Sequence, residues 1–264
     1  MTKSLIPLFF FTALLLFVVP GSYASSKWEV RNDFGRYFDS AHVHGGILLY
    51  DPIEGKYLVY NRKRCDSAFI PASTYKIFNS LVGLETGAVK DENDTIKWDG
   101  TKYDNPEWNH DHTMRSAIKV SAVWFYQEIA RRVGYKRMKY YIALAHYGNE
   151  NIEGGIDQFW LEGKLRITPK QQIDLLNRLY RDKLPFSKRS MAIVRDIMIR
   201  QKTNVYIYRS KTGWADKIGW YVGYIERAGK PFFFAMNIDI DNDEDIKARI
   251  TVTENILKTL KMID

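Results

Sequence analysis

Residues 71–87 read PASTYKIFNSLVGLETG, and this stretch decides where the helical part of the fold begins. Apolar residues recur in it at helical spacing, at Ile77, Leu81 and Leu84. They predict a helix that ends at Gly87. Ser73 and Lys76 are three residues apart, so they share one face of its first turn. A hydroxyl beside an amine that can take its proton is a nucleophile–base pair, although the same spacing occurs on ordinary solvated helices.

Strand patterns lie toward both ends of the chain. The candidates are residues 47–50, 56–60, 205–209, 218–226 and 231–239. The first two candidates lie on either side of residues 51–55, whose composition is typical of a turn. Together they predict a hairpin. The breaks between the later strands contain Gly213 and Gly229. Residues 243–261 predict a helix, because the first turn is acidic and the last turn is basic.

The middle of the chain predicts helices. We expect them over residues 122–133, 135–146, 168–181 and 187–200. Thr168 and Ser187 are the expected N-caps. Residues 147–167 form a long stretch with little periodicity, and such loops are often functional. The fold class is therefore α/β of the α+β type: an antiparallel sheet built from both terminal segments, with flanking helices and an inserted helical region. A cleft between sheet and helices is the default place for a site.

The composition and the N-terminus limit the possible functions. The chain has 264 residues, a formal charge of +8 and one cysteine, Cys65, which excludes an intrachain disulfide. The positive charge is compatible with binding to nucleic acid, to a membrane surface or to an anionic small molecule.

Residues 1–24 resemble a cleavable signal peptide that ends at Ala24, and the alternative is an uncleaved membrane anchor. We predict export to the periplasm, one domain over residues 25–264 and no stable membrane association.

A second motif supports chemistry at Ser73. Lys211-Thr212-Gly213 follows a predicted strand. It supplies a cation, a hydroxyl and a backbone free of Cβ, which suit an acyl group docking beside the strand. Ser-x-x-Lys together with Lys-Thr-Gly is a signature of penicillin-recognising serine enzymes.

Further motifs make the resemblance specific. They are Ser121-Ala122-Val123, Tyr147-Gly148-Asn149, Gln158-Phe159-Trp160-Leu161 and, less specifically, Trp108-Asn109-His110-Asp111-His112. Through nearly the whole mature chain the sequence resembles the class D β-lactamases, the oxacillinases. The resemblance implies a β-lactamase/transpeptidase-like fold, penicillin binding and hydrolysis of β-lactam antibiotics, which confers antibiotic resistance.

The resemblance also implies roles for individual residues. Ser73 would be the acylated nucleophile, and Lys76 would carry a carboxyl group (N6-carboxylysine) and act as general base. Ser121 would relay a proton to the leaving nitrogen. The backbone N–H groups of Ser73 and Trp214 would form the oxyanion hole. Trp160 would hydrogen-bond the carboxylated lysine, and Val123 and Leu161 would keep its pocket dry and gate water. The substrate would contact Lys211, Thr212, Gly213, Arg249 and Tyr147.

Several alternatives stay open at this stage. The pairs His42/His44 and His110/His112 suggest a metal, but a third ligand has no recognisable spacing, so we predict none. Carbon dioxide or bicarbonate is the only expected co-reactant, β-lactams are the expected partners, and nucleic acid has no supporting motif. The alternative function is a β-lactam sensor or a transpeptidase that acylates without efficient deacylation. Residues 214–217 form a short loop that leaves the substrate spectrum open, and the oligomeric state is also open.

Overall fold

A sheet of seven strands organises the protein, whose computed structural model describes residues 27–264. The strand order is β1-β3-β2-β9-β8-β7-β6. Its strands are β1 (Lys27–Val30), β2 (Gly45–Asp51), β3 (Lys56–Tyr60), β6 (Ile199–Lys202), β7 (Tyr206–Ala215), β8 (Ile218–Arg227) and β9 (Lys230–Asp239). Neighbours are antiparallel except at one edge, where β1 runs parallel to β3. The prediction of a sheet built from both terminal segments is confirmed. The strands β4 (Thr95–Ile96) and β5 (His112–Thr113) pair separately.

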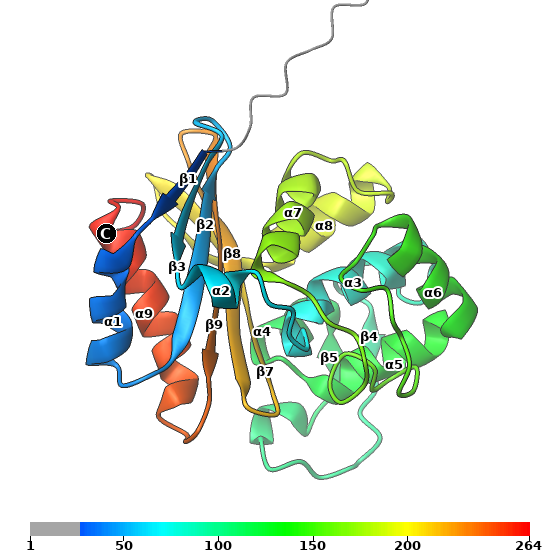
Figure 1. Ribbon diagram of the computed structural model, residues 1–264. Helices are drawn as coiled ribbons and strands as arrows, with labels where there is room; N and C mark the ends of the chain where they lie inside the picture. The colour runs from blue at the N-terminus through cyan, green and yellow to red at the C-terminus, as the bar shows by residue number, and fades with distance from the viewer. Residues whose placement is uncertain (1–26) are drawn as a thin grey trace, which may run out of the picture.

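Helices cover both faces of the sheet (Figure 1). One face carries α1 (Gly35–Ser40) and α9 (Asp245–Thr259). On the other side, α7 packs on β2, β8 and β9, and most of the remaining helices lie beyond it. The helices on this side are α2 (Arg62–Cys65), α3 (Lys76–Glu85), α4 (Met114–Val120), α5 (Val123–Val133), α6 (Tyr135–Leu144), α7 (Pro169–Tyr180) and α8 (Lys188–Ile197). The short 3-10 helices are η1 (Asn32–Phe34), η2 (Ala72–Tyr75) and η3 (Pro106–Trp108).

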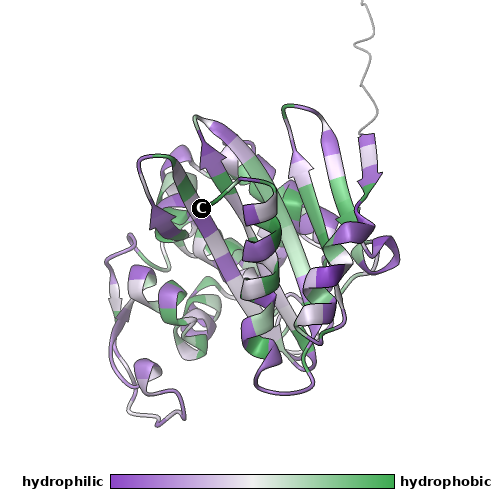
Figure 2. Cartoon of the chain, turned by 90° about the vertical axis from the view of Figure 1, so that its left-hand side faces the viewer, coloured by the Kyte–Doolittle hydropathy of each residue, from purple (hydrophilic) through white to green (hydrophobic). Residues whose placement is uncertain are grey.

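The core lies on both faces of the sheet because side chains alternate along each strand. On β8, Val222 and Tyr224 join the large cluster under α3, α5 and α7, whereas Tyr221 and Ile225 join the cluster under α1 and α9. Seen from the side of α1 and α9, the strands behind these helices carry long hydrophobic stretches (Figure 2). A sheet buried on both faces is a rigid support for residues held along one of its strands.

Two predicted boundaries were wrong. Gly213 does not lie in a break, because β7 continues through it to Ala215. The helix that Ser187 caps ends at Ile197, and Arg200 belongs to β6, which pairs with β7. β6 is a short edge strand with mostly polar residues, so its sequence lacks the alternation of apolar and polar residues by which a strand is predicted.

Helix starts agree well with the sequence. Thr168 caps α7 with its side chain while Gln171 bonds back to the Thr168 backbone, as a capping box requires. The proposed signal peptide lies outside the described residues. Within residues 27–264, the structure contains no helix with the length and apolar character needed to cross a membrane.

Candidate active site

Ser73 lies where the chain enters the helical region. It belongs to η2, directly before α3, and is 7% exposed. Ala72 has φ +50° and donates its backbone N–H to Trp160 O at 3.0 Å. A left-handed non-glycine residue beside a candidate nucleophile is held there by its surroundings. In this way residue 160, far along the sequence, fixes the turn that presents Ser73.

Lys76 is completely buried and contacts Ser73 directly. Its Nζ lies 2.8 Å from Ser73 Oγ, 2.7 Å from Ser121 O and 3.0 Å from Ser121 Oγ. Burial holds the pKa of Lys76 well below its usual value, and the charge of Lys211 lowers this pKa further. The neutral amine, the form that can act as a base or a nucleophile, is therefore favoured.

Ser121 bridges two lysines. It ends α4 in a left-handed conformation with φ +59°. Its Oγ lies 3.0 Å from Lys76 Nζ and 3.0 Å from Lys211 Nζ. A hydroxyl can both donate and accept a proton, so Ser121 connects the side chain on α3 with the one on β7.

β7 brings the Lys-Thr-Gly motif against η2. A Cβ built on Gly213 would lie 3.1 Å from Pro71 O and 3.2 Å from Thr74 N. Glycine is thus required for the close approach of the strand to the turn that carries Ser73. Lys211 is 4% exposed, and its Nζ also donates to Thr212 O at 2.9 Å.

The edge of β7 that faces away from β8 is partly free. β6 pairs only with residues 207–209, and Ser210 N donates to Met198 O on that side. Because N–H groups alternate along a strand, those of Thr212 and Trp214 face the same edge. Trp214 therefore presents a backbone donor beyond the reach of β6, while its side chain is half exposed.

Arg249 joins the site from α9. It is 8% exposed, and its Nη1 donates to Gly213 O at 2.6 Å. Burial lowers its pKa to about 10. Burial and the charge of Arg249 together lower the pKa of Lys211 to about 7. Among residues 27–264, no acidic side chain forms an ion pair with Arg249, Lys76 or Lys211. Arg249 therefore leaves a buried positive charge without an acidic partner beside Lys211, which favours an anionic ligand.

Trp160 lies behind the nucleophile, in the loop of residues 147–167. It is 0% exposed and stacks on Tyr75 with ring centroids 5.2 Å apart. Its Nε1 is a buried donor without a hydrogen-bond partner. Buried donors are rarely left unpaired, so this one indicates an acceptor in the functional protein.

Tyr147-Gly148-Asn149 closes that loop rather than facing the cleft. A Cβ on Gly148 would lie 2.2 Å from Arg166 O, and Asn149 bonds Lys164 O and Arg166 N through its side chain. Tyr147 is 1% exposed and packs against Tyr75 and Phe78. Its side chain is therefore core, and the contact of Tyr147 with substrate stays a prediction.

Val123, at the start of α5, and Leu161, in the loop of residues 147–167, are both half-buried.

The segment around Trp108 contacts the turn between α4 and α5, since Trp108 Nε1 donates to Val120 O at 3.0 Å. His112 bonds Ser116 Oγ and Glu107 O. Within residues 27–264, the structure places no three His, Cys, Asp or Glu side chains together as a metal site.

Sequence reasoning missed one buried contact behind the nucleophile. Gln172 on α7 is 0% exposed and donates to Thr74 Oγ1 at 2.8 Å, and Thr74 Oγ1 donates to Pro71 O. The contact joins residues 98 positions apart: Thr74 occupies a variable position of Ser-x-x-Lys, and Gln172 belongs to no recognisable motif. Only the fold reveals it.

The comparisons with known proteins agree with this geometry. The penicillin binding protein transpeptidase domain family matches residues 45–259, which places the chain among the penicillin-recognising serine enzymes. The chain is 40% identical to β-lactamase OXA-48 of Klebsiella pneumoniae, over 90% of this chain and 92% of that one. A crystal structure of the class D β-lactamase YbXI from Nostoc matches with 48% identity and a TM-score of 0.85, covering 87% of this chain and 99% of that one. The chain belongs to the class D β-lactamases, which confirms the resemblance found in the sequence.

A regulatory relative also matches. Over 78% of this chain, the sequence is 36% identical to the regulatory protein BlaR1 of Bacillus licheniformis. The match covers only 35% of BlaR1. A protein with a regulatory name therefore contains a segment similar to this chain.

Proposed function

We propose that this enzyme hydrolyses β-lactam antibiotics through an acyl-enzyme on Ser73, with a carboxylated Lys76 as general base. The single observation that carries the proposal is the 2.8 Å contact between Ser73 Oγ and a completely buried Lys76. Such burial favours the neutral amine, and only a neutral amine reacts with carbon dioxide.

The surroundings of Lys76 fit a carboxyl group on its Nζ. Trp160 Nε1 is a buried donor that lacks an acceptor, and an added carboxylate would supply one. The nearby cationic groups Lys211 and Arg249 have no acidic partner within residues 27–264, so a negative charge is favoured there. When present, the carboxyl group supplies a base that can take the proton of Ser73 and later that of a water molecule.

In acylation, Ser73 Oγ attacks the lactam carbonyl carbon and the lactam C–N bond breaks. Ser121, hydrogen-bonded to both lysines, passes a proton to the leaving nitrogen. The backbone N–H groups of Ser73 and Trp214 bind the carbonyl oxygen as it gains charge, each such donor being worth about 3–4 kcal/mol of barrier. Lys211, Thr212 and Arg249 hold the ring carboxylate, and Gly213 lets the strand approach.

In deacylation, water attacks the ester carbonyl, the bond to Ser73 Oγ breaks, and Ser73 recovers a proton. Val123 and Leu161, both half-buried, limit how much water reaches Lys76. The product is the ring-opened acid, and its release completes one turnover. Export directed by residues 1–24 would place this reaction in the periplasm.

Turnover of a penicillin tests the proposal against a sensor or transpeptidase role. The purified protein is mixed with excess penicillin, and loss of the lactam is followed by absorbance. We expect a continuing steady state, because Lys76 serves both half-reactions. A single stoichiometric burst, with acyl-enzyme that persists in the mass spectrum, would assign the protein to the sensor class.

Carbon dioxide dependence tests the base. Activity is measured in degassed, mildly acidic buffer before and after bicarbonate is added, and carbon-13 bicarbonate is used to look for a carbamate resonance. We expect activity to fall on degassing and to recover with bicarbonate. Equal activity under both conditions, without a resonance, would refute carboxylation while leaving Ser73 acylation in place.

A further inference from the structure

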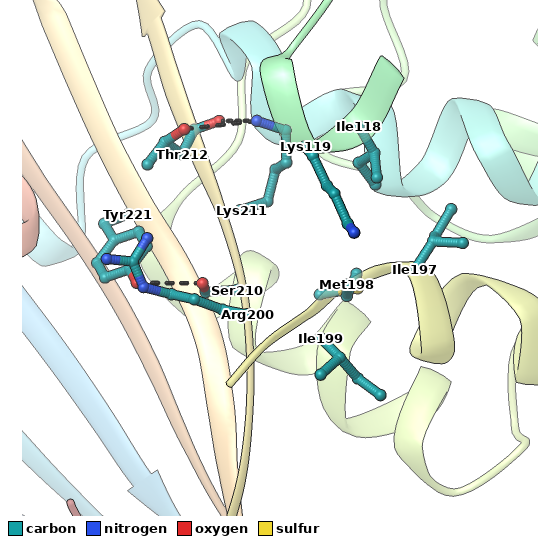
Figure 3. A pocket seen from close by; sticks show the side chains of 10 residues that line it. All are labelled: Ile118, Lys119, Ile197, Met198, Ile199, Arg200, Ser210, Lys211, Thr212 and Tyr221. Carbon is teal, nitrogen blue, oxygen red and sulfur yellow. Dashed lines mark hydrogen bonds between the residues drawn. The ribbon is translucent and has the colours of Figure 1, made fainter. Parts of the chain in front are cut away.

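A cavity of about 370 Å³ opens beside Lys211 of the proposed active site (Figure 3). Its walls come from the end of α4, the junction of α8 with β6, and the strands β7 and β8. The lining residues are Ile118, Lys119, Ile197, Met198, Ile199, Arg200, Ser210, Lys211, Thr212 and Tyr221. Lys211 and Thr212 also belong to the proposed active site, so the cavity continues that site along β7.

The position of the cavity relative to the reacting atoms defines what can enter it. Under the proposed function, the lactam carbonyl lies by the N–H of Trp214 and the ring carboxylate by Lys211 and Thr212. Ser210 lies four residues before Trp214, about 13 Å along the strand. The cavity therefore begins where the ring carboxylate ends, on the side away from the scissile bond. A substituent on the ring carbon next to that carboxylate would extend into it.

The lining combines an apolar floor with positive charge. Ile118, Ile197 and Met198 are buried. Lys119 extends from α4 toward the cavity, and Arg200 lies beside the Tyr221 ring at 5.9 Å (Figure 3). The lining contains no Asp or Glu. Arg200 forms an ion pair with Glu254, at 3.4 Å. Lys119 forms no ion pair within residues 27–264.

We propose that this cavity is a subsite for a negatively charged ring substituent, so that the enzyme prefers β-lactams with a second anion beside the ring carboxylate. The inference rests on the proposed function and names a substrate class for the same site. Lys119 supplies an uncompensated charge, and Arg200 shares its charge with Glu254. Because both side chains are exposed to solvent, the attraction is modest and depends on salt.

A pair of cephalosporins tests this subsite. They carry the same acyl side chain and differ only at ring position 3, where one has a carboxylate-bearing substituent and the other has its neutral amide. The measured quantity is the ratio of their kcat/KM values, anionic over neutral. We expect a ratio above one that falls about threefold in Lys119→Gln and about threefold in Arg200→Gln. The ratio should also fall with added sodium chloride.

Two further variants serve as controls. Arg200→Lys keeps the charge and should keep most of the ratio, which separates charge from loss of packing on Tyr221. Lys136→Gln removes the same charge from the exposed face of α6, away from the cavity, and should leave the ratio unchanged.

The outcomes separate the two proposals. If the neutral substrate turns over and the ratio is one or less, the apolar floor governs binding and the anion subsite is refuted. An equal change for both substrates in Lys119→Gln and Arg200→Gln would also refute it. If neither cephalosporin nor a penicillin turns over, the proposed function itself fails, and the subsite with it.

Discussion

The replacement Gly213→Ala should separate the two halves of the site by a few tenths of an ångström. The added methyl would lie 3.1 Å from Pro71 O, 3.1 Å from Thr74 Cγ2 and 3.2 Å from Thr74 N, all shorter than ordinary van der Waals contact. Two of these atoms are backbone, so the strain cannot be relieved by rotating a side chain. η2 must move, and Ser73, between Pro71 and Thr74, moves with it.

The expected result is a loss of activity larger than the loss of stability. Small misplacements of reacting groups are costly, and we expect kcat/KM for a penicillin to fall about tenfold. Overpacking of this kind should cost about 1–3 kcal/mol of unfolding free energy, which urea denaturation measures.

A matched control is available on the neighbouring strand. A Cβ on Gly219, in β8, would meet only side-chain carbons of Ile240 and Ile238, the nearest at 2.7 Å. Gly219 pairs with Trp214 of β7, but its Cβ would face Ile240 and Ile238 rather than η2. Gly219→Ala should therefore lower stability while keeping kcat/KM within about twofold. Wild-type kcat/KM in Gly213→Ala, or the same loss in both variants, would refute the reasoning.

Four other predictions follow from the geometry. Trp160→Phe keeps the aromatic ring on Tyr75 but removes the unpaired donor, so the carbamate resonance and kcat should each fall about tenfold; an unchanged resonance would contradict the proposed contact. Val123→Asp brings charge and water to Lys76, so acyl-enzyme should accumulate in the mass spectrum; normal deacylation would contradict the dry pocket. Lys211 has a folded-state pKa of about 7, below its unfolded value of 10.5, so the unfolded chain binds more protons between these pH values. Its contribution to unfolding free energy should then rise by about 2–3 kcal/mol from pH 6.5 to 9 in carbonate-free buffer, and Lys211→Met should flatten that slope; equal slopes would refute it. Thr168→Ala breaks the capping box and should lower stability by about 1 kcal/mol, seen as a Tm lower by about 2–4 °C with activity retained.

The parts of the fold that were predicted correctly are those coded locally. The hairpin of β2 and β3 follows from a turn composition between two apolar runs, and α7 begins where Thr168 and Gln171 can cap each other. The motif residues Ser73, Lys76, Ser121 and Lys211 do meet, as their resemblance to the family implied.

The errors share a different cause. Gly213 reads as a chain break because glycine usually is one, yet here it serves a contact with a turn about 140 residues away. Two other placements also depend on distant elements: Tyr147 belongs to a motif near the site but packs into the core, and the predicted site residue Arg249 reaches Gly213 from a helix on the opposite face of the sheet. The direction of a side chain relative to a distant element depends on the tertiary structure, so a local sequence pattern does not predict it.

The strand order also sets when the protein can fold during synthesis. β2 pairs with β9, which lies far along the chain, so the central pair of the sheet cannot close until β9 has left the ribosome. Ser73 likewise waits for Lys211, 138 residues later. A chain with this topology spends its synthesis without a completed core, and reaches activity in one late step.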